Sequence, residues 1–401
     1  MIPTIRSRLA LAAVLLLVAG CSPAPTATPP GSTALASPTP GATASGPPSC
    51  AAQTLQGMNE GERVGQLFLL GLANDQLGVA EQNAIVIDHI GSVWFTATSQ
   101  AGAVAIRSVA DATQALAPAA GPAGGKVGLF VAANQEGGLV QALRGPGFSR
   151  IPTAVDQGNL SASTLQADAK TWGNQLKAAG INLDFAPVSD VVPAANTSSN
   201  QPIGVLQREY GSTPAAVGSH AAAFVVGMAS AGILTVAKHF PGLGRVTGNT
   251  DDVAGVIDSK TTLTDPNLGA FRTVIGAKVP IVMVALATYT KIDPSTLAAF
   301  SPIVIGTLLR KNLGFGGLVM SDDLGATVAV ASIPPATRAI DFISAGGEMV
   351  ISKTAGPAIA MAVAITARTS TDPAFRTLVD NAALHVLEVK AQAHLLTCAG
   401  S

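Results

Sequence analysis

Eight short apolar runs, separated by Ala-rich amphipathic stretches, restrict the fold of this chain more than any other feature. The stretches 103–116, 161–179, 214–231 and 302–313 have the pattern of helices. Alternating strands and helices form a parallel sheet, and strands buried on both faces read as continuous apolar runs. The expected strands are 66–72, 92–95, 128–134, 182–188, 233–239, 280–286, 317–322 and 348–352. The pattern predicts an α/β fold with a closed (β/α)₈ barrel of the TIM type, or alternatively a doubly wound open sheet.

The N-terminal segment 1–21 has the features of an export signal. Arg6 and Arg8 precede the apolar run 9–18, and small residues lead to Cys21. The run is shorter than the ~20 apolar residues that cross a bilayer, so a cleaved signal fits better than a membrane span. The Val-Ala-Gly-Cys sequence resembles the lipobox of bacterial lipoproteins, which implies a lipid on Cys21. An ordinary signal peptide with an incidental cysteine is the alternative.

Residues 22–49 contain only Ser, Pro, Ala, Thr, Gly and one Leu. A segment of this composition cannot bury a core, and it predicts an extended tether between the lipid and a folded domain over 50–401. We therefore expect an extracytoplasmic protein that is held on the outer face of the cell membrane by its lipid anchor alone.

Composition excludes several functional classes. Charged residues make up 12% of the chain and the net charge is −1, which argues against nucleic-acid partners. The histidines are scattered and no cysteine pair has metal-ligand spacing, so neither a metal nor another cofactor is predicted. Cys50 and Cys398 flank the folded region, and in an oxidising compartment we expect them to form a disulfide, with two free thiols as the alternative. We expect a monomer.

Polar groups follow three of the predicted strands at the point where each strand ends. Gln135-Glu136 follows the third run, Lys238-His239 ends the fifth, and Ser321-Asp322-Asp323 ends the seventh. In a barrel the carboxyl ends of all strands meet at one mouth, where catalytic residues lie. Ser321-Asp322-Asp323 could instead cap a helix, but the three motifs together favour a functional site.

These motifs resemble the catalytic barrel of family-3 glycoside hydrolases, in particular the single-domain bacterial β-N-acetylhexosaminidases. The resemblance extends over 55–365, and the Lys-His-Phe-Pro-Gly and Ser-Asp-Asp-Leu runs are its most specific parts. The matching segments are Asn134-Gln-Glu-Gly-Gly138, Asn182-Leu-Asp-Phe-Ala-Pro-Val188, Arg208-Glu-Tyr-Gly211, Lys238-His-Phe-Pro-Gly242, Ser301-Pro302, Leu309-Arg310, Leu313-Gly-Phe315 and Val319-Met-Ser-Asp-Asp-Leu324.

The resemblance implies a retaining mechanism. Asp322 matches the nucleophile that attacks the anomeric carbon and forms a glycosyl-enzyme ester. Asp323 would orient Asp322 or cap the next helix. Arg208, Lys238 and His239 match residues that hold the hydroxyls of the innermost sugar, a rigid array suited to a ring whose charge grows in the transition state.

The sequence departs from the family pattern at three places. Asn134 stands where the family usually has a sugar-binding Asp; its amide oxygen can still accept a hydrogen bond, but without the help of a charge. Leu243 replaces a second histidine. The acid/base histidine of the hexosaminidases corresponds to Asp251, and the Asp that supports it corresponds to Asn249. Asp251 therefore becomes the expected acid/base, with Asp252 or Glu136 able to share the role.

Asp251 can serve as the acid only if it is protonated when the leaving group departs. The nearby Asp322 and removal from water would raise its pKa in that direction. A carboxylate at this position would also repel phosphate, which favours hydrolysis over phosphorolysis.

The expected activity is exo-cleavage of terminal β-linked N-acetylhexosamine from peptidoglycan-derived or chitin-like oligosaccharides. The alternatives are a glycan-binding lipoprotein with weakened catalysis and an enzyme that resembles the β-glucosidases.

Overall fold

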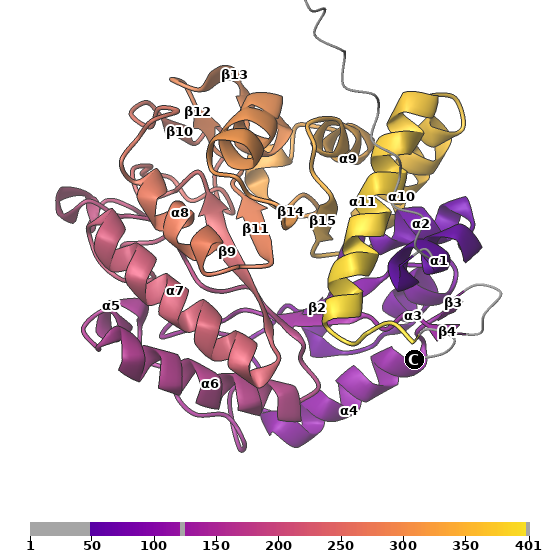
Figure 1. Cartoon of the computed structure of the whole chain (residues 1–401), viewed down its shortest axis with the longest axis horizontal. Coiled ribbons are helices and arrows are strands. Elements are labelled where there is room, and N and C mark those ends of the chain that lie inside the picture. The colour runs from indigo at the N-terminus through magenta and orange to yellow at the C-terminus, as the bar shows by residue number, and fades with distance from the viewer. Residues whose placement is uncertain (1–48, 121–124, 398–401) are drawn as a thin grey trace, which may run out of the picture. The chain divides into compact units, whose positions relative to one another are not determined.

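The computed structural model describes residues 49–120 and 125–397, and its centre is a closed barrel of eight parallel strands (Figure 1). All eight predicted strands are present. Because β1 pairs with β2 on one side and with β15 on the other, the sheet closes and the open-sheet alternative is wrong. In order around the barrel, the strands are β1 (Phe68–Leu72), β15 (Met349–Ser352), β14 (Leu318–Asp323), β11 (Ile281–Val284), β9 (Leu234–Phe240), β8 (Leu183–Asp184), β5 (Phe130–Ala133) and β2 (Ser92–Phe95).

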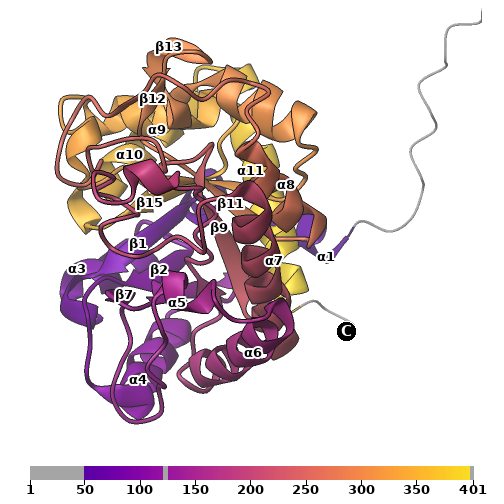
Figure 2. The same cartoon turned by 90° about the vertical axis from the view of Figure 1, so that its left-hand side faces the viewer.

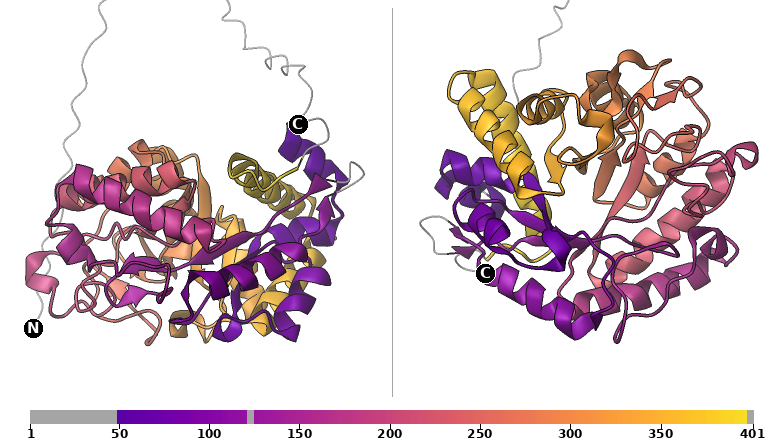
Figure 3. Two further views of the ribbon diagram at one scale, coloured as in Figure 1. Left: turned by 90° about the horizontal axis from the view of Figure 1, so that it is seen from below. Right: turned by 180° about the vertical axis from the view of Figure 1, so that it is seen from behind.

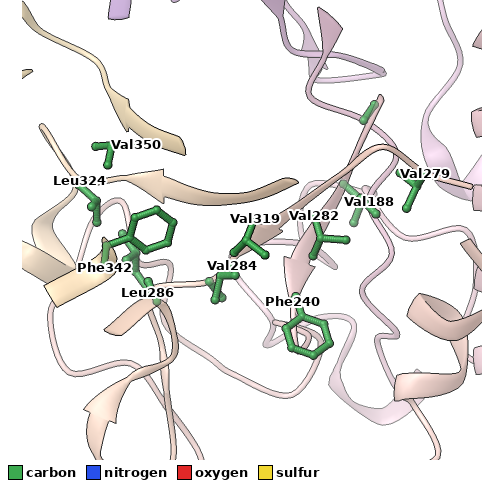
Figure 4. Close-up of a cluster of buried hydrophobic side chains, with 14 of the residues drawn as sticks. Val188, Phe240, Val279, Val282, Val284, Leu286, Val319, Leu324, Phe342 and Val350 are labelled. Atoms are coloured by element: carbon green, nitrogen blue, oxygen red, sulfur yellow. The ribbon is translucent and has the colours of Figure 1, made fainter. Parts of the chain in front are cut away.

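Both faces of the barrel strands are buried, which explains their continuous apolar runs. In β11, Ile281 and Met283 point into the barrel, whereas Val282 and Val284 join the layer between the strands and the outer helices (Figure 4). Burying an aliphatic side chain of this size contributes about 1.5–3 kcal/mol. The strands are therefore held in place from the inside and the outside together.

Helices surround the barrel, and α6 and α7 lie side by side (Figures 1 and 2). Side chains of Ser161 and Thr213 cap the first turns of α6 and α7, as is usual where a helix begins. The helices are α1 (Cys50–Gly57), α2 (Glu60–Gln66), α3 (Val79–Val86), α4 (Gly102–Ala115), α5 (Ala154–Gln157), α6 (Ala162–Ala178), α7 (Pro214–Ala231), α8 (Leu268–Gly276), α9 (Pro335–Ser344), α10 (Ala355–Thr369) and α11 (Pro373–Gln392).

Two helices differ from the others in type or in composition. The predicted helix 302–313 is a wider π-helix over Ile303–Asn312. In the described part of the chain, α7 alone has the length and apolar character of a membrane span, but half of it is buried, and Phe224 and Met228 belong to the core beside the barrel.

The C-terminal helix closes the amino-terminal end of the barrel. Val386 and Val389 of α11 pack with the side chains inside the barrel. Lys390 donates hydrogen bonds to the side-chain oxygen of Gln66, just before β1, and to the carbonyl of Gly91, just before β2, both at 2.7 Å. Figure 3 shows α11 beside the N-terminal helices. The opposite, carboxyl-terminal end of the barrel is not covered by this helix.

Short additional elements build the rim of that opposite end. A hairpin of β6 (Gln135–Gly137) and β7 (Val140–Gln141) follows β5. A small sheet of β10 (Ile257–Asp258), β12 (Thr288–Tyr289) and β13 (Asp293–Leu297) follows β9 and β11. A third pair, β3 (Ala119–Ala120) and β4 (Gly125–Lys126), precedes β5 and therefore lies at the other, amino-terminal end, where the Thr397 N–H donates to the Lys126 carbonyl at 3.1 Å.

A disulfide holds the N-terminal end of the folded region. The helix α1 begins at Cys50, and Cys50 is disulfide-bonded, as expected. Its predicted partner Cys398, the tether 22–49 (apart from its last residue) and the lipid-bearing Cys21 lie outside the described residues.

Candidate active site

All six side chains predicted to act in catalysis or sugar binding line one cavity at the carboxyl end of the barrel. Its volume is about 410 Å³, within the range of small-molecule sites. Apolar side chains of Trp94, Phe185, Met283 and Ile351 also line it. The six predicted residues are Asn134, Arg208, Lys238, His239, Asp251 and Asp322. Over residues 49–120 and 125–397, no cluster of acidic, histidine or cysteine side chains is suited to a metal ion.

Asp322 lies near the end of β14, with one carboxylate oxygen fixed and the other available. Its Oδ1 accepts the backbone N–H of Asp323 at 2.8 Å, and Oδ2 has no hydrogen-bond donor among the described residues. Asp323 accepts the backbone N–H groups of Gly325 and Lys353, at 2.8 and 3.0 Å. Burial raises the pKa of Asp323 to about 6 despite these donors. Asp323 therefore holds the turn after β14, and Asp322 presents a free oxygen to the cavity.

Glu136 is the centre of an ion network behind the cavity. The Arg208 guanidinium donates to both of its oxygens, at 2.8 and 2.7 Å, and the Lys238 ammonium lies 2.6 Å from Oε1. Burial by itself would raise the pKa of Glu136, but the two cations outweigh it and lower the pKa to about 2. Glu136 is therefore ionised and held by both cations, which argues against a share in the acid/base role.

Lys238 also fixes Asn134. Its ammonium group donates to the Oδ1 atom of Asn134 at 2.8 Å. We expected that oxygen to accept from a sugar hydroxyl; the structure directs it to Lys238 instead and leaves the amide nitrogen of Asn134 as a donor. Asn134 can thus reach a sugar through its N–H groups.

His239 is oriented by Asp190, a residue that the sequence analysis missed. Its Nδ1 lies 2.8 Å from Asp190 Oδ2, and the backbone N–H of Leu243 donates to Asp190 Oδ1 at 2.7 Å. Because a carboxylate only accepts, Nδ1 carries a proton, and whenever the imidazole is neutral its Nε2 is an acceptor. Asp190 comes two residues after the predicted strand 182–188, so the strand-end rule that selected Asp322 could have found it.

The loop that carries Asp251 lies across the mouth and is attached to the segment after β14. The backbone N–H of Ala329 donates to the Thr250 carbonyl at 3.1 Å, and that of Val328 donates to the Asp251 carbonyl at 3.4 Å. Asp251 is exposed to solvent at its surface, yet partial burial of its carboxyl group and the Asp322 carboxylate raise its pKa, against weaker opposing effects of His239 and Arg208. Asp251 and Asp322 are therefore close enough to interact.

Asp252 is held by its neighbour instead. Its Oδ2 accepts a hydrogen bond from the Asn249 side-chain amide at 2.8 Å.

Two further polar groups escaped the sequence analysis because they sit inside apolar runs. The Nε1 atom of Trp94 is buried at the cavity and has no acceptor within the part of the chain that the structure describes. Asp184 accepts the Gln135 backbone N–H at 3.0 Å, and burial raises its pKa to about 7. Trp94 offers a donor to a ligand, whereas Asp184 supports the β5 end from behind.

The chain is similar in sequence to known glycoside hydrolases. Residues 61–389 match the family described as the glycosyl hydrolase family 3 N terminal domain. A beta-hexosaminidase of Alkalilimnicola ehrlichii is 32% identical over 293 residues, covering 71% of this chain and 79% of that protein. A beta-hexosaminidase of Stenotrophomonas maltophilia strain K279a is 31% identical over 294 residues, with 71% and 82% covered.

Solved structures of related enzymes have a similar fold. The crystal structure of a beta-N-acetylhexosaminidase from Beutenbergia cavernae is 46% identical, with a TM-score of 0.80 over 83% of this chain and 99% of that chain. A family 3 beta-N-acetylglucosaminidase from Paenibacillus shares the fold at 24% identity and a TM-score of 0.73, over 86% of this chain and 64% of that one.

Proposed function

The chain belongs to glycosyl hydrolase family 3 and is a glycoside hydrolase for β-linked N-acetylhexosamine, and we propose that it is an exo-acting, retaining enzyme with Asp322 as nucleophile and Asp251 as acid/base. The observation that carries this proposal is the shared cavity of these two carboxyl groups, one with a free oxygen and the other with a raised pKa.

The proposed reaction has two steps. The free oxygen of Asp322 attacks the anomeric carbon, and protonated Asp251 gives its proton to the glycosidic oxygen as the leaving group departs. Asp251, now a carboxylate, takes a proton from water, and the resulting hydroxide opens the ester on Asp322. The sugar leaves with its original β configuration and both carboxyl groups return to their starting states.

The ion network supports recognition of a single terminal sugar. Glu136 and Asp190 hold Arg208, Lys238 and His239 in fixed positions, so their groups need no reorganisation when a sugar binds. These residues come from the β5, β8 and β9 side of the barrel, and β5 lies opposite β14 in the strand order. A ring with its anomeric carbon at Asp322 would thus meet this network at its far end, which supports exo cleavage.

The charges of the cavity support water as the acceptor. When the acceptor enters, Asp322 is esterified, but the Asp251 carboxylate and its neighbour Asp252 still line the cavity, and their negative charge opposes an incoming phosphate. Incubation with phosphate should yield only the free sugar, measured by mass spectrometry; accumulation of a sugar 1-phosphate would contradict the proposal.

The biological setting is also a proposal. A signal at 1–21, a lipid on Cys21 and a tether over 22–49 would present a monomeric enzyme on the outer face of the membrane. Peptidoglycan-derived or chitin-like fragments are the β-linked amino sugars expected there. A Cys21→Ala change should release the protein from the membrane fraction if the lipid is its anchor.

The decisive assay is release of 4-nitrophenol from its β-N-acetylglucosaminide. Asp322→Asn and Asp251→Asn should each lose activity, the first by a factor of about 10³ or more. Asp252→Asn is the matched control, since it removes a neighbouring carboxylate and should retain most activity. Proton NMR of the first product should show the β anomer, and an α product would exclude retention. A wild-type protein that binds glycans without turnover would favour the binding-protein alternative.

A further inference from the structure

A second cavity shares a wall with the active site. Val140 and Leu206 line the catalytic cavity, and their chain neighbours Leu139, Val205 and Gln207 line the second one, whose volume is about 680 Å³. We call it the arginine cavity, and define it by Gln100, Leu139, Arg144, Phe148, Arg150 and Gln207.

The walls of the arginine cavity are held by backbone hydrogen bonds. The Arg144 N–H donates to the Ser99 carbonyl at 2.9 Å, and the Gly102 N–H donates to the Arg144 carbonyl at 3.1 Å. On the other side, the Ala154 N–H donates to the Gln207 carbonyl at 3.1 Å. Gly145 has φ 92° and packs so tightly that a β carbon would lie 2.3 Å from the Gln100 carbonyl oxygen. The cavity is thus preformed.

The arginine cavity has basic side chains and no acidic ones, whereas both kinds line the catalytic cavity. The Arg144 guanidinium is held by two backbone carbonyls, those of Gln141 at 2.8 Å and Gly138 at 3.1 Å, so no carboxylate offsets its charge. Arg150 is exposed and makes no ion pair with any residue that the structure describes. None of the residues that line this cavity is acidic.

The remaining lining suits a sugar ring. Leu139 is 66% exposed and Val205 44%, so they give an accessible apolar surface. The Gln100 and Gln207 side chains have no hydrogen bond to the rest of the described chain, and their amides can pair with hydroxyl groups.

We propose that the arginine cavity binds a saccharide unit that carries a carboxylate group, with its ring on Leu139 and Val205 and its carboxylate on Arg144 and Arg150. Guanidinium groups pair with carboxylates in a directional, often two-point geometry. The cavity adjoins the β5 side of the barrel, away from Asp322, so it would hold an acidic glycan beside the catalytic cavity without taking part in bond cleavage. The proposal goes beyond the proposed hydrolysis and does not depend on it.

Calorimetric titration of the purified full-length protein with N-acetylmuramic acid, and with its methyl ester as a neutral twin, tests the proposal. Wild type should bind the acid more tightly than the ester. Arg150→Gln should weaken binding of the acid roughly fivefold and leave binding of the ester unchanged. Arg107→Gln removes an exposed arginine elsewhere, on α4, and should have no effect. A double change, Arg144→Gln with Arg150→Gln, should abolish the preference for the acid.

Equal affinity for the acid and its ester would overturn the proposal, as would equal losses in Arg150→Gln and Arg107→Gln. Turnover of the small 4-nitrophenyl substrate should be the same in Arg150→Gln and wild type, because this arginine does not line the catalytic cavity. Since binding and turnover are measured separately, failure of the proposed hydrolysis would not be mistaken for failure of this site.

Discussion

Replacing Asp190 by Asn tests whether the geometry of the His239 side chain matters for sugar recognition. Asn has the same shape, so the site keeps its packing. Its Nδ2 group, however, can meet His239 Nδ1 only if that nitrogen has lost its proton. The imidazole would then carry its proton on Nε2, and the acceptor that faces the cavity would become a donor.

The size of the effect follows from the bonds involved. The Oδ1 atom of Asp190 accepts from Leu243 at 2.7 Å, a bond that the Asn oxygen can keep. The bond between His239 and the charged Oδ2 atom is lost or reversed, and a hydrogen bond to a charged group contributes ~1.5–3 kcal/mol. At 1.36 kcal/mol per factor of ten, kcat/KM should fall by a factor of about 10 to 150.

A double-mutant cycle distinguishes this cause from general damage. We expect Asp190→Asn to act through His239, so in a His239→Ala background it should lower kcat/KM by less than about threefold. Thermal unfolding of each variant identifies any loss of the folded protein. Additive losses in the double mutant, or an Asp190→Asn protein with wild-type kcat/KM, would refute the reasoning.

Two further predictions concern groups that have no partner of opposite charge or no partner at all. Burial lowers the pKa of Lys390 to about 7, whereas the unfolded chain holds this proton up to about pH 10. The unfolded state therefore binds more protons between these two pH values, so the free energy of unfolding should rise with pH in that window. The Lys390→Met variant should show a flatter rise of Tm between pH 7 and 9 than wild type. An unchanged slope of Tm against pH would contradict this prediction. Trp94→Phe removes the unpaired indole N–H of the cavity. Its KM for the 4-nitrophenyl substrate should increase roughly three- to tenfold with little change in Tm, and an unchanged KM would show that the N–H does not meet the sugar.

The barrel could be predicted from the sequence because each strand is marked locally. A run such as 280–286 is apolar on both faces, and only a strand enclosed on both sides satisfies that pattern. Among the barrel strands, β8 is the shortest, and the predicted run 182–188 is longer than the observed strand Leu183–Asp184. Pro187 in that run has no N–H to donate, and beyond Asp184 the contact with β9 continues through an isolated bridge between Val188 and Lys238 and not as a regular ladder.

The partners of the site residues could not be predicted because they depend on contacts between distant segments. Asp190 reaches His239 because the chain after β8 runs beside β9, where the Ser189 N–H donates to the Lys238 carbonyl at 2.6 Å. Glu136 was visible as a carboxylate at a strand end, but its pairing with Arg208 depends on a loop 72 residues away. The polar residues at strand ends could therefore be identified from the sequence. The hydrogen-bond and ion-pair partners of Asn134 and Glu136, which decide their roles, could not.

The carboxylate at position 251 makes one last property of the mechanism testable. Burial raises the pKa of Asp251, and Asp322 raises it further because its negative charge opposes a second one nearby. When Asp322 becomes an ester its charge disappears, so the pKa of Asp251 should fall at the step where this residue must turn from acid to base.

The Asp322→Asn variant imitates the uncharged state. Titration of carboxyl-labelled aspartates by carbon NMR should show a lower midpoint for Asp251 in Asp322→Asn than in wild type, with Asp251→Asn used to assign the signal. Asp252→Asn should lower the same midpoint by less, because Asp252 is the weaker of its two acidic neighbours. If the midpoint does not respond to Asp322→Asn, the two carboxyl groups are not coupled and a different residue must supply the proton.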